Sequence, residues 1–75
     1  MKFTIITQMN CKYCTKAAQL LDDAGLDWES YPLADAHVIR TLFSMTNLTT
    51  VPQIFHPDGT LIGGYENLRA YLGRT

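Results

Sequence analysis

Two cysteines, Cys11 and Cys14, stand where a short apolar stretch gives way to a helical pattern. The apolar stretch, Phe3 to Thr7, is rich in β-branched residues and predicts a central strand, whereas the pattern from Lys12 onward predicts a helix. A helix start carries backbone N–H groups without intrahelical partners and about half a positive charge, and both stabilise a thiolate. The junction therefore predicts redox chemistry at Cys11.

Length and charge narrow the possible classes of protein. The chain has 75 residues, 47% of them hydrophobic, which predicts a single domain over residues 1–75. The net charge is -1 and the basic residues are scattered, so we expect no nucleic-acid binding. No apolar run approaches the roughly 18 residues of a membrane span, and no secretory signal pattern is present. We expect a cytoplasmic monomer without membrane attachment, and in that compartment a CxxC pair is more often catalytic or metal-binding than a structural staple.

Periodicity and turn residues predict the order of the elements. The first helix covers Lys12 to Ala24, and Gly25 suits a left-handed C-cap. The turn His56–Gly59 predicts an antiparallel hairpin, while the first half of the chain predicts parallel strands. The fold class is α/β, in the order βαβαββα, with a mixed four-stranded sheet and helices on both faces. The later elements are a strand over Asp27–Tyr31, a helix over Val38–Met45 capped by Asp35, strands over Thr50–Phe55 and Thr60–Ile62, and a helix over Tyr65–Leu72.

Three motifs together resemble the glutaredoxins of the thioredoxin superfamily. They are Cys11-Lys12-Tyr13-Cys14, Thr50-Val51-Pro52-Gln53-Ile54-Phe55 and Gly63-Gly64-Tyr65-Glu66-Asn67-Leu68, in the order and spacing of that family. The stretch from Gln53 to Arg69 is most similar to the small glutaredoxins of bacteriophages. The resemblance covers essentially the whole chain and implies a thioredoxin-like fold with glutathione-dependent thiol–disulfide oxidoreductase activity.

The spacing of the two cysteines also predicts their roles. A dithiol reduces a disulfide when one thiolate attacks a sulfur and a second thiol releases the mixed disulfide. Two intervening residues place Cys11 ahead of the helix and exposed, and Cys14 one turn inside and more buried. Cys11 is thus the predicted nucleophile and Cys14 the resolving thiol. The charge of Lys12 adds to the effect of the helix end but is screened by water and salt.

The second motif contains a proline that opens a strand. The resemblance implies that the Val51–Pro52 peptide bond is cis and that the backbone of Val51 pairs with a bound peptide. Outside this context, a proline that opens a strand is most often an ordinary trans edge residue.

The third motif implies the rest of a glutathione site. Gly63 and Gly64 allow close backbone approach, so the amides of Glu66 and Asn67 form an anion site. The resemblance implies that this site, with Pro52 and Gly64 beside it, holds the γ-glutamyl carboxylate of glutathione, and that a side chain at Glu66 or Asn67 meets the ligand's amino group. Tyr13 either packs beside the sulfurs and contacts the ligand or is a partly buried helix aromatic.

Three residues depart from the usual family pattern. Gln8 replaces a lysine found in many relatives, Asn67 replaces an aspartate, and Lys12 replaces a proline. The neutral Asn67 should weaken the contact with an ammonium group. Arg40 either compensates for Gln8 by binding a ligand carboxylate or solvates its helix face.

Glutathione is the expected reductant, and the expected partners are client proteins with disulfides or glutathionylated thiols, with ribonucleotide reductase the family's best-known client. No metal is expected, because His37 and His56 do not have zinc-ligand spacing relative to the cysteines. Three alternatives stay open. The chain can be a thioredoxin-like donor reduced by thioredoxin reductase, an iron–sulfur carrier ligated by Cys11 and glutathione, or a binding module in which the cysteines form a static bridge.

Overall fold

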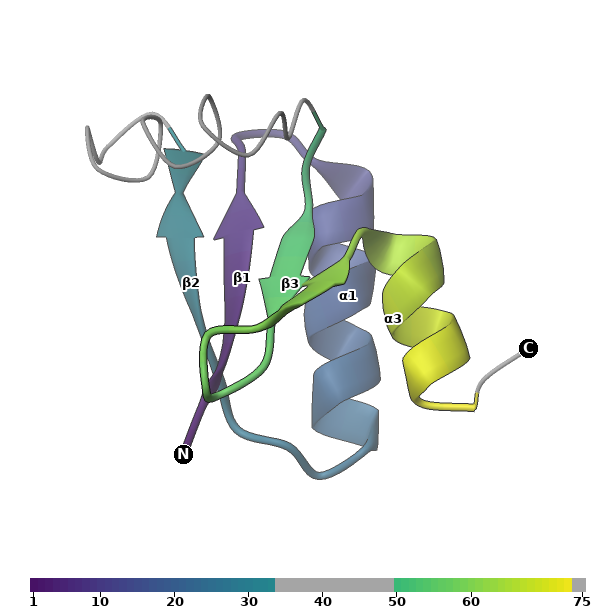
Figure 1. The fold of residues 1–75 in the computed structure, drawn as a ribbon. Helices are drawn as coiled ribbons and strands as arrows, with labels where there is room; N and C mark the ends of the chain where they lie inside the picture. The colour runs from purple at the N-terminus through teal and green to yellow at the C-terminus, as the bar shows by residue number, and fades with distance from the viewer. Residues whose placement is uncertain (34–49, 74–75) are drawn as a thin grey trace.

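The computed structural model describes residues 1–33 and 50–73, which contain a four-stranded sheet and two helices (Figure 1). Neither of these helices combines the length and the hydropathy that crossing a membrane requires. The predicted helix over 38–45, its cap Asp35 and the candidate ligand contact Arg40 lie outside the described residues. The elements are β1 (Phe3–Thr7), α1 (Lys12–Asp23), β2 (Trp28–Pro32), β3 (Gln53–Phe55), β4 (Leu61–Gly63) and α3 (Tyr65–Tyr71).

The sheet has the strand order β2-β1-β3-β4. Strand β1 pairs with β2 in parallel, and it pairs with β3 in antiparallel fashion, where Ile5 lies opposite Ile54. Strands β3 and β4 form the antiparallel hairpin. The predicted mixed four-stranded sheet and thioredoxin-like fold are confirmed. Because β1 is central, the loop that carries the cysteines emerges from the middle of the sheet.

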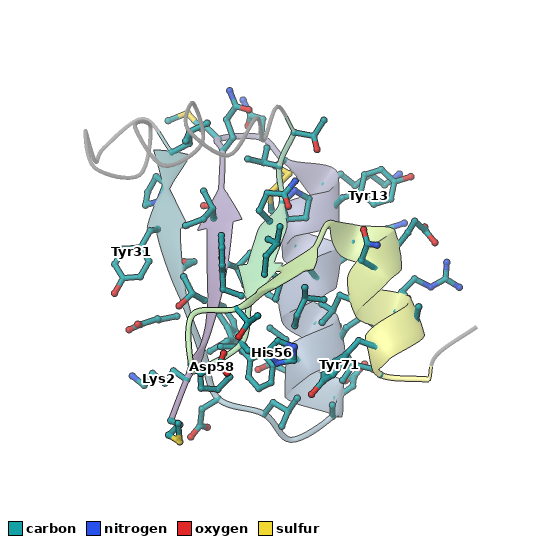
Figure 2. All side chains as sticks on the ribbon, viewed as in Figure 1. Lys2, Tyr13, Tyr31, His56, Asp58 and Tyr71 are labelled. Carbon is teal, nitrogen blue, oxygen red and sulfur yellow. A yellow bond between two sulfur atoms is a disulfide. The ribbon has the colours of Figure 1, made fainter. Side chains whose placement is uncertain are left out.

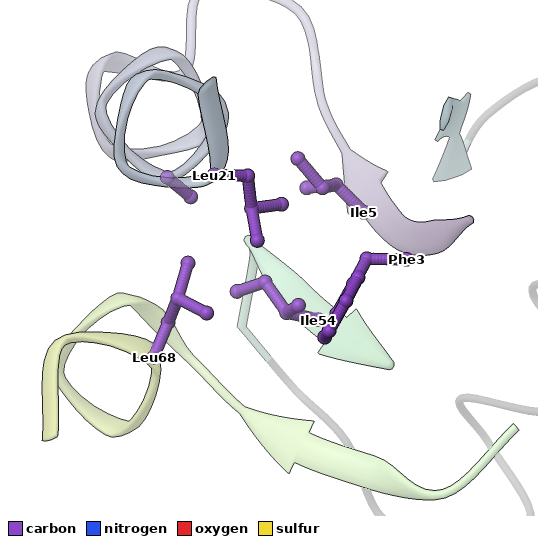
Figure 3. Close-up of a cluster of buried hydrophobic side chains, with 6 residues drawn as sticks. Phe3, Ile5, Leu21, Ile54 and Leu68 are labelled. Atoms are coloured by element: carbon purple, nitrogen blue, oxygen red, sulfur yellow. The ribbon is translucent and has the colours of Figure 1, made fainter. Parts of the chain in front are cut away.

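The hydrophobic core lies between the sheet and the two described helices, which pack against each other (Figures 1 and 3). Leu21 of α1 and Leu68 of α3 point toward Ile5 and Ile54 of the sheet, and all four side chains are fully buried. Burying a side chain of this size contributes about 1.5–3 kcal/mol. This packing holds the start of α1 near the start of α3, which positions the site described below.

The ends of α1 follow from its sequence. Its buried residues Cys14, Ala17 and Leu21 recur at helical spacing, so one face of the helix meets the core. Gly25 has a φ of 73° and its N–H bonds to the carbonyl of Asp22, as expected for a residue that ends a helix.

Several predicted strand ends are wrong by one to three residues. Strand β3 begins at Gln53 instead of Thr50, because Pro52 has no N–H to donate to the ladder. Strand β2 continues through Pro32, since β2 is an edge strand and a missing donor there costs no ladder bond. Strand β4 runs over Leu61–Gly63, one residue later than predicted. The reason is that Thr60 is held in the turn, where its N–H donates to Asp58 Oδ1 at 2.9 Å.

Both described helices end one residue earlier than predicted, at Asp23 and Tyr71. Ala24 and Leu72, the predicted last residues, are the C-cap residues of α1 and α3.

Candidate active site

The two cysteines lie at the start of α1 and form a disulfide, with their Cα atoms 5.3 Å apart. Cys11 is the N-cap residue in extended conformation, and Cys14 lies in the first turn of the helix. The backbone N–H of Cys14 donates to Cys11 Sγ at 3.1 Å. Cys14 is buried, with 6% of its surface exposed, whereas Cys11 is partly exposed. A thiol from solution therefore reaches the sulfur of Cys11 first.

This geometry determines what the pair can do. In an N-cap position a side-chain acceptor satisfies a helix N–H that has no intrahelical partner. The sulfur of Cys11 occupies that acceptor position, so after reduction the same N–H and the helix dipole favour its thiolate. The position predicted for Cys11 ahead of the helix, and the deeper burial predicted for Cys14, are both confirmed.

The turn that leads from β1 to Cys11 depends on Asn10. This residue has a φ of 61°, in the left-handed region that asparagine adopts more readily than most residues. It places Cys11 at the helix start directly after the turn. The sequence analysis did not single out Asn10, although an asparagine just before a helix N-cap is a recognisable signal for such a turn.

A pocket of about 400 Å³ lies beside the cysteines, between the start of α1, the entry to β3 and the start of α3. The resemblance implies seven residues for the glutathione site, and six of them line this pocket: Tyr13, Val51, Pro52, Gly64, Glu66 and Asn67. The seventh, Arg40, is outside the described residues. Thr50 and Tyr65 belong to the quoted motifs but were not predicted to line the site. The lining residues are Tyr13, Thr50, Val51, Pro52, Gly64, Tyr65, Glu66 and Asn67, and we call this cavity the Val51 pocket.

The Val51–Pro52 peptide bond is cis, as the resemblance to glutaredoxins implies. Pro52 is buried, and a Cβ added to Gly64 would lie 3.6 Å from the carbonyl oxygen of Pro52. A methyl group at Gly64 would therefore be in ordinary van der Waals contact with the entry to β3.

The loop before α3 depends on a glycine. Gly63 has a φ of 125°, and a Cβ there would lie 2.7 Å from the side chain of Asn67. Asn67 Oδ1 accepts the N–H of Gly64 at 3.1 Å. The first backbone bond within α3 runs from the N–H of Leu68 to the carbonyl of Gly64, so the amides of Glu66 and Asn67 precede it.

The side chains predicted to meet the ligand's amino group already have partners. The oxygen of Asn67 binds the backbone of Gly64, and the carboxylate of Glu66 pairs with Arg69 at 3.1 Å. A ligand ammonium would compete with these contacts. The weak contact expected from the neutral amide of Asn67 stays a prediction.

One wall of the Val51 pocket consists of two tyrosines. The rings of Tyr13 and Tyr65 lie 5.3 Å apart between centroids in a tilted arrangement. Tyr13 is 51% exposed, so about half of it is accessible from the pocket side or from solvent, and both interpretations of this residue stay open. Lys16 Nζ lies over the Tyr13 ring at 5.1 Å, and the guanidinium of Arg69 lies over the Tyr65 ring at 5.8 Å.

A second groove, of about 620 Å³, lies on the other side of the cysteines, between α1 and the edge strand β2. Both cysteines line it, together with Trp28 of β2. Gln8 and Lys12, two of the departures from the family pattern, also line this groove and not the Val51 pocket. The groove was not predicted, because it forms only where α1 packs beside β1 and β2.

The family model for glutaredoxin matches residues 3–62. The chain belongs to the glutaredoxin family. It is 36% identical over 71 residues to glutaredoxin 3 of Escherichia coli, a match that covers 93% of this chain and 84% of that protein. It is 40% identical over 69 residues, 92% of its length, to the hybrid peroxiredoxin hyPrx5 of Haemophilus influenzae, but spans only 28% of that relative.

A solved structure agrees with this assignment. The fold is similar to that of glutaredoxin 1 from Francisella tularensis complexed with cacodylate, with a TM-score of 0.76 at 28% identity. That match covers 96% of this chain and 92% of the other. Family membership and the Cys11–Cys14 disulfide together identify a thiol–disulfide oxidoreductase of the thioredoxin superfamily.

Proposed function

We propose that this glutaredoxin is a glutathione-dependent oxidoreductase that uses both cysteines, acting as a monomer in the cytoplasm. The Cys11 thiolate attacks a client disulfide, one client thiolate leaves, and a mixed disulfide forms. The Cys14 thiolate then attacks Cys11 Sγ, releasing the second client thiolate and closing the Cys11–Cys14 disulfide. Two glutathione thiols return the enzyme to its reduced form through a Cys11–glutathione mixed disulfide, and leave as glutathione disulfide.

One observation carries this proposal. Cys11 Sγ is at once partly exposed and the acceptor of a helix N–H, whereas Cys14 is buried one turn deeper. A nucleophile must be accessible and ionised, and a resolving thiol needs only to reach its neighbour. This asymmetry supports the two roles.

The Val51 pocket supports glutathione as the ligand. Members of the family use glutathione as reductant. A tripeptide that enters this pocket can pair with the backbone of Val51 while its thiol reaches Cys11. Its γ-glutamyl carboxylate can then accept the amides of Glu66 and Asn67, and the ring of Tyr13 covers one side.

Two client classes follow. Ribonucleotide reductase is the client that the family implies. A peroxiredoxin disulfide is the second, because the relative named a hybrid peroxiredoxin contains a matching segment within a longer chain. Reduction of each purified client, followed by mass spectrometry of its cysteines, distinguishes them.

The reductant is tested by two coupled assays of the same enzyme. One supplies glutathione and glutathione reductase, the other thioredoxin reductase, and both follow NADPH oxidation. We expect turnover with glutathione. Turnover with thioredoxin reductase alone would overturn the proposal and favour a thioredoxin-like donor.

A substitution at Asn67 tests the pocket itself. We expect Asn67→Asp to lower the KM for glutathione by about threefold, because it adds a charge facing the ligand's ammonium at an exposed site. The carboxylate can still accept the N–H of Gly64, so stability should change little. An unchanged or higher KM would contradict binding of the γ-glutamyl group at the start of α3.

A further inference from the structure

Helix α1 carries its charges at the ends where they destabilise it. Lys12 and Lys16 lie in its first half, with no acidic residue in the first turn, and Asp22 and Asp23 lie in its last turn. The helix dipole favours the reverse arrangement. Lys12 and Lys16 are also four residues apart, so the two ammonium groups repel each other on one helix face.

The acidic end has a structural reason. Asp22 Oδ1 accepts the indole N–H of Trp28 at 2.8 Å, which ties α1 to β2, and Asp23 Oδ1 accepts the side-chain N–H of Gln19 at 2.9 Å. Among the residues that the structure describes, neither Lys12 nor Lys16 makes a comparable side-chain hydrogen bond. Over residues 1–33 and 50–73, the only salt bridge joins Arg69 and Glu66, so no carboxylate in these ranges neutralises Lys16. Lys16 therefore holds an unfavourable helix position without a carboxylate partner in these ranges, and such a departure from the favoured charge pattern is typical of a functional position.

Lys16 belongs to a continuous surface. Its ammonium lies over Tyr13, Tyr13 contacts Tyr65, and Arg69 lies over Tyr65, with successive separations of 5.1, 5.3 and 5.8 Å. We call these four residues the cation–aromatic surface. Tyr13 is the residue directly before Cys14, so the surface adjoins the disulfide. Figure 2 shows Tyr13 at the cysteine end of the molecule and Lys2 at the opposite end.

We propose that the cation–aromatic surface docks an acidic segment of the client protein next to the client's disulfide. Arg69 is paired with Glu66, so the exposed ammonium of Lys16 supplies the positive charge that speeds the encounter with an oppositely charged partner. Tyrosine rings add contact area with little loss of side-chain entropy. The exchange itself needs only the two cysteines. The client disulfide gains two electrons and two protons, and Cys11 and Cys14 are oxidised to their disulfide, so this docking holds whether or not glutathione is the reductant.

The test uses single-turnover reduction of two synthetic peptides by the pre-reduced protein, freed of excess reductant. Both peptides carry the same disulfide loop, one flanked by three aspartates and the other by three asparagines. We expect the wild-type protein to reduce the acidic peptide about tenfold faster at low salt, and the two at similar rates in 0.5 M salt, on the scale of electrostatic steering. The ratio of the two rates cancels any change in the reactivity of Cys11.

Two substitutions that change the net charge equally locate the effect. Lys16→Glu should abolish the preference for the acidic peptide, whereas Lys2→Glu, at the opposite end, should retain it. Lys16→Glu should also raise the thermal unfolding midpoint. It removes the repulsion with Lys12 and places a carboxylate in the first half of α1, where the helix dipole favours negative charge. A gain in stability together with a loss of preference is a result that a structural role for Lys16 cannot produce.

The proposal is overturned by any of three results. They are equal rates for the two peptides with the wild-type protein, a preference that survives Lys16→Glu, and an equal loss of preference in the Lys2→Glu control. Failure to reduce either peptide would instead reject exchange at Cys11, and the docking with it.

Discussion

The two ends of the sheet differ in whether their side chains contact one another or remain accessible. At the hairpin end, aromatic and polar groups contact one another: His56 lies 4.8 Å from Tyr71 and 5.7 Å from Phe3 between ring centroids, and Asp58 binds Thr60 (Figure 2). At the cysteine end, Cys11 is partly exposed beside one groove and the exposed Tyr13 lines the Val51 pocket. Substitutions at the hairpin end should therefore change stability, and those at the cysteine end should change disulfide exchange.

The largest effect is expected at the nucleophile. Cys11→Ser should reduce exchange on the order of a thousandfold or more, because a hydroxyl does not replace a thiolate. Serine is a good N-cap residue, so the stability of the reduced protein should be retained. Cys14→Ser should lose reduction of protein disulfides but retain reduction of glutathionylated thiols, which needs only Cys11. Rapid-mixing kinetics with both substrate types measure this, and equal losses in the two variants would contradict the assigned roles.

Substitutions of Gly63 and Gly64 test which backbone position near the cysteines the stability of the fold depends on. Gly63→Ala should lower the free energy of unfolding by about 2 kcal/mol, since its backbone is left-handed and its Cβ would collide with Asn67. Gly64 has a φ of -84°, so Gly64→Ala should cost less than about 1 kcal/mol. Urea denaturation measures both. Equal costs would show that the pocket does not depend on the Gly63 conformation.

The smallest effect is expected at the hairpin turn. Hydrogen bonds from the hydroxyl and then the N–H of Thr60 hold the pKa of Asp58 below its ordinary value. The stability that this carboxylate contributes is present above the unfolded pKa of about 3.9 and is lost as the pH falls through the lower folded pKa. Between pH 5 and pH 2, the thermal midpoint should fall less in Asp58→Asn than in the wild type. Disulfide exchange at pH 7 should be unchanged.

Local sequence signals predicted much of the molecule. The apolar run Phe3–Thr7, the helical spacing after Lys12 and the turn residues around Asp58 each depend on nearby residues, and all three elements are confirmed. The larger errors occurred at strand ends, because pairing with a neighbouring strand determines where a strand begins and ends. Pro32 stays in a strand only because that strand lies at the sheet edge.

Some features of the site also follow from local sequence, whereas others depend on tertiary packing. The order of Cys11 and Cys14 at a helix start is local, so sequence alone determined which sulfur is the exposed N-cap and which is buried. The contact of Tyr13 with Tyr65 joins residues far apart in the chain, and the groove beside Trp28 forms only where α1 packs on the sheet. Only the tertiary structure decided these, because side-chain spacing across helices and strands depends on how their buried faces pack in the common core.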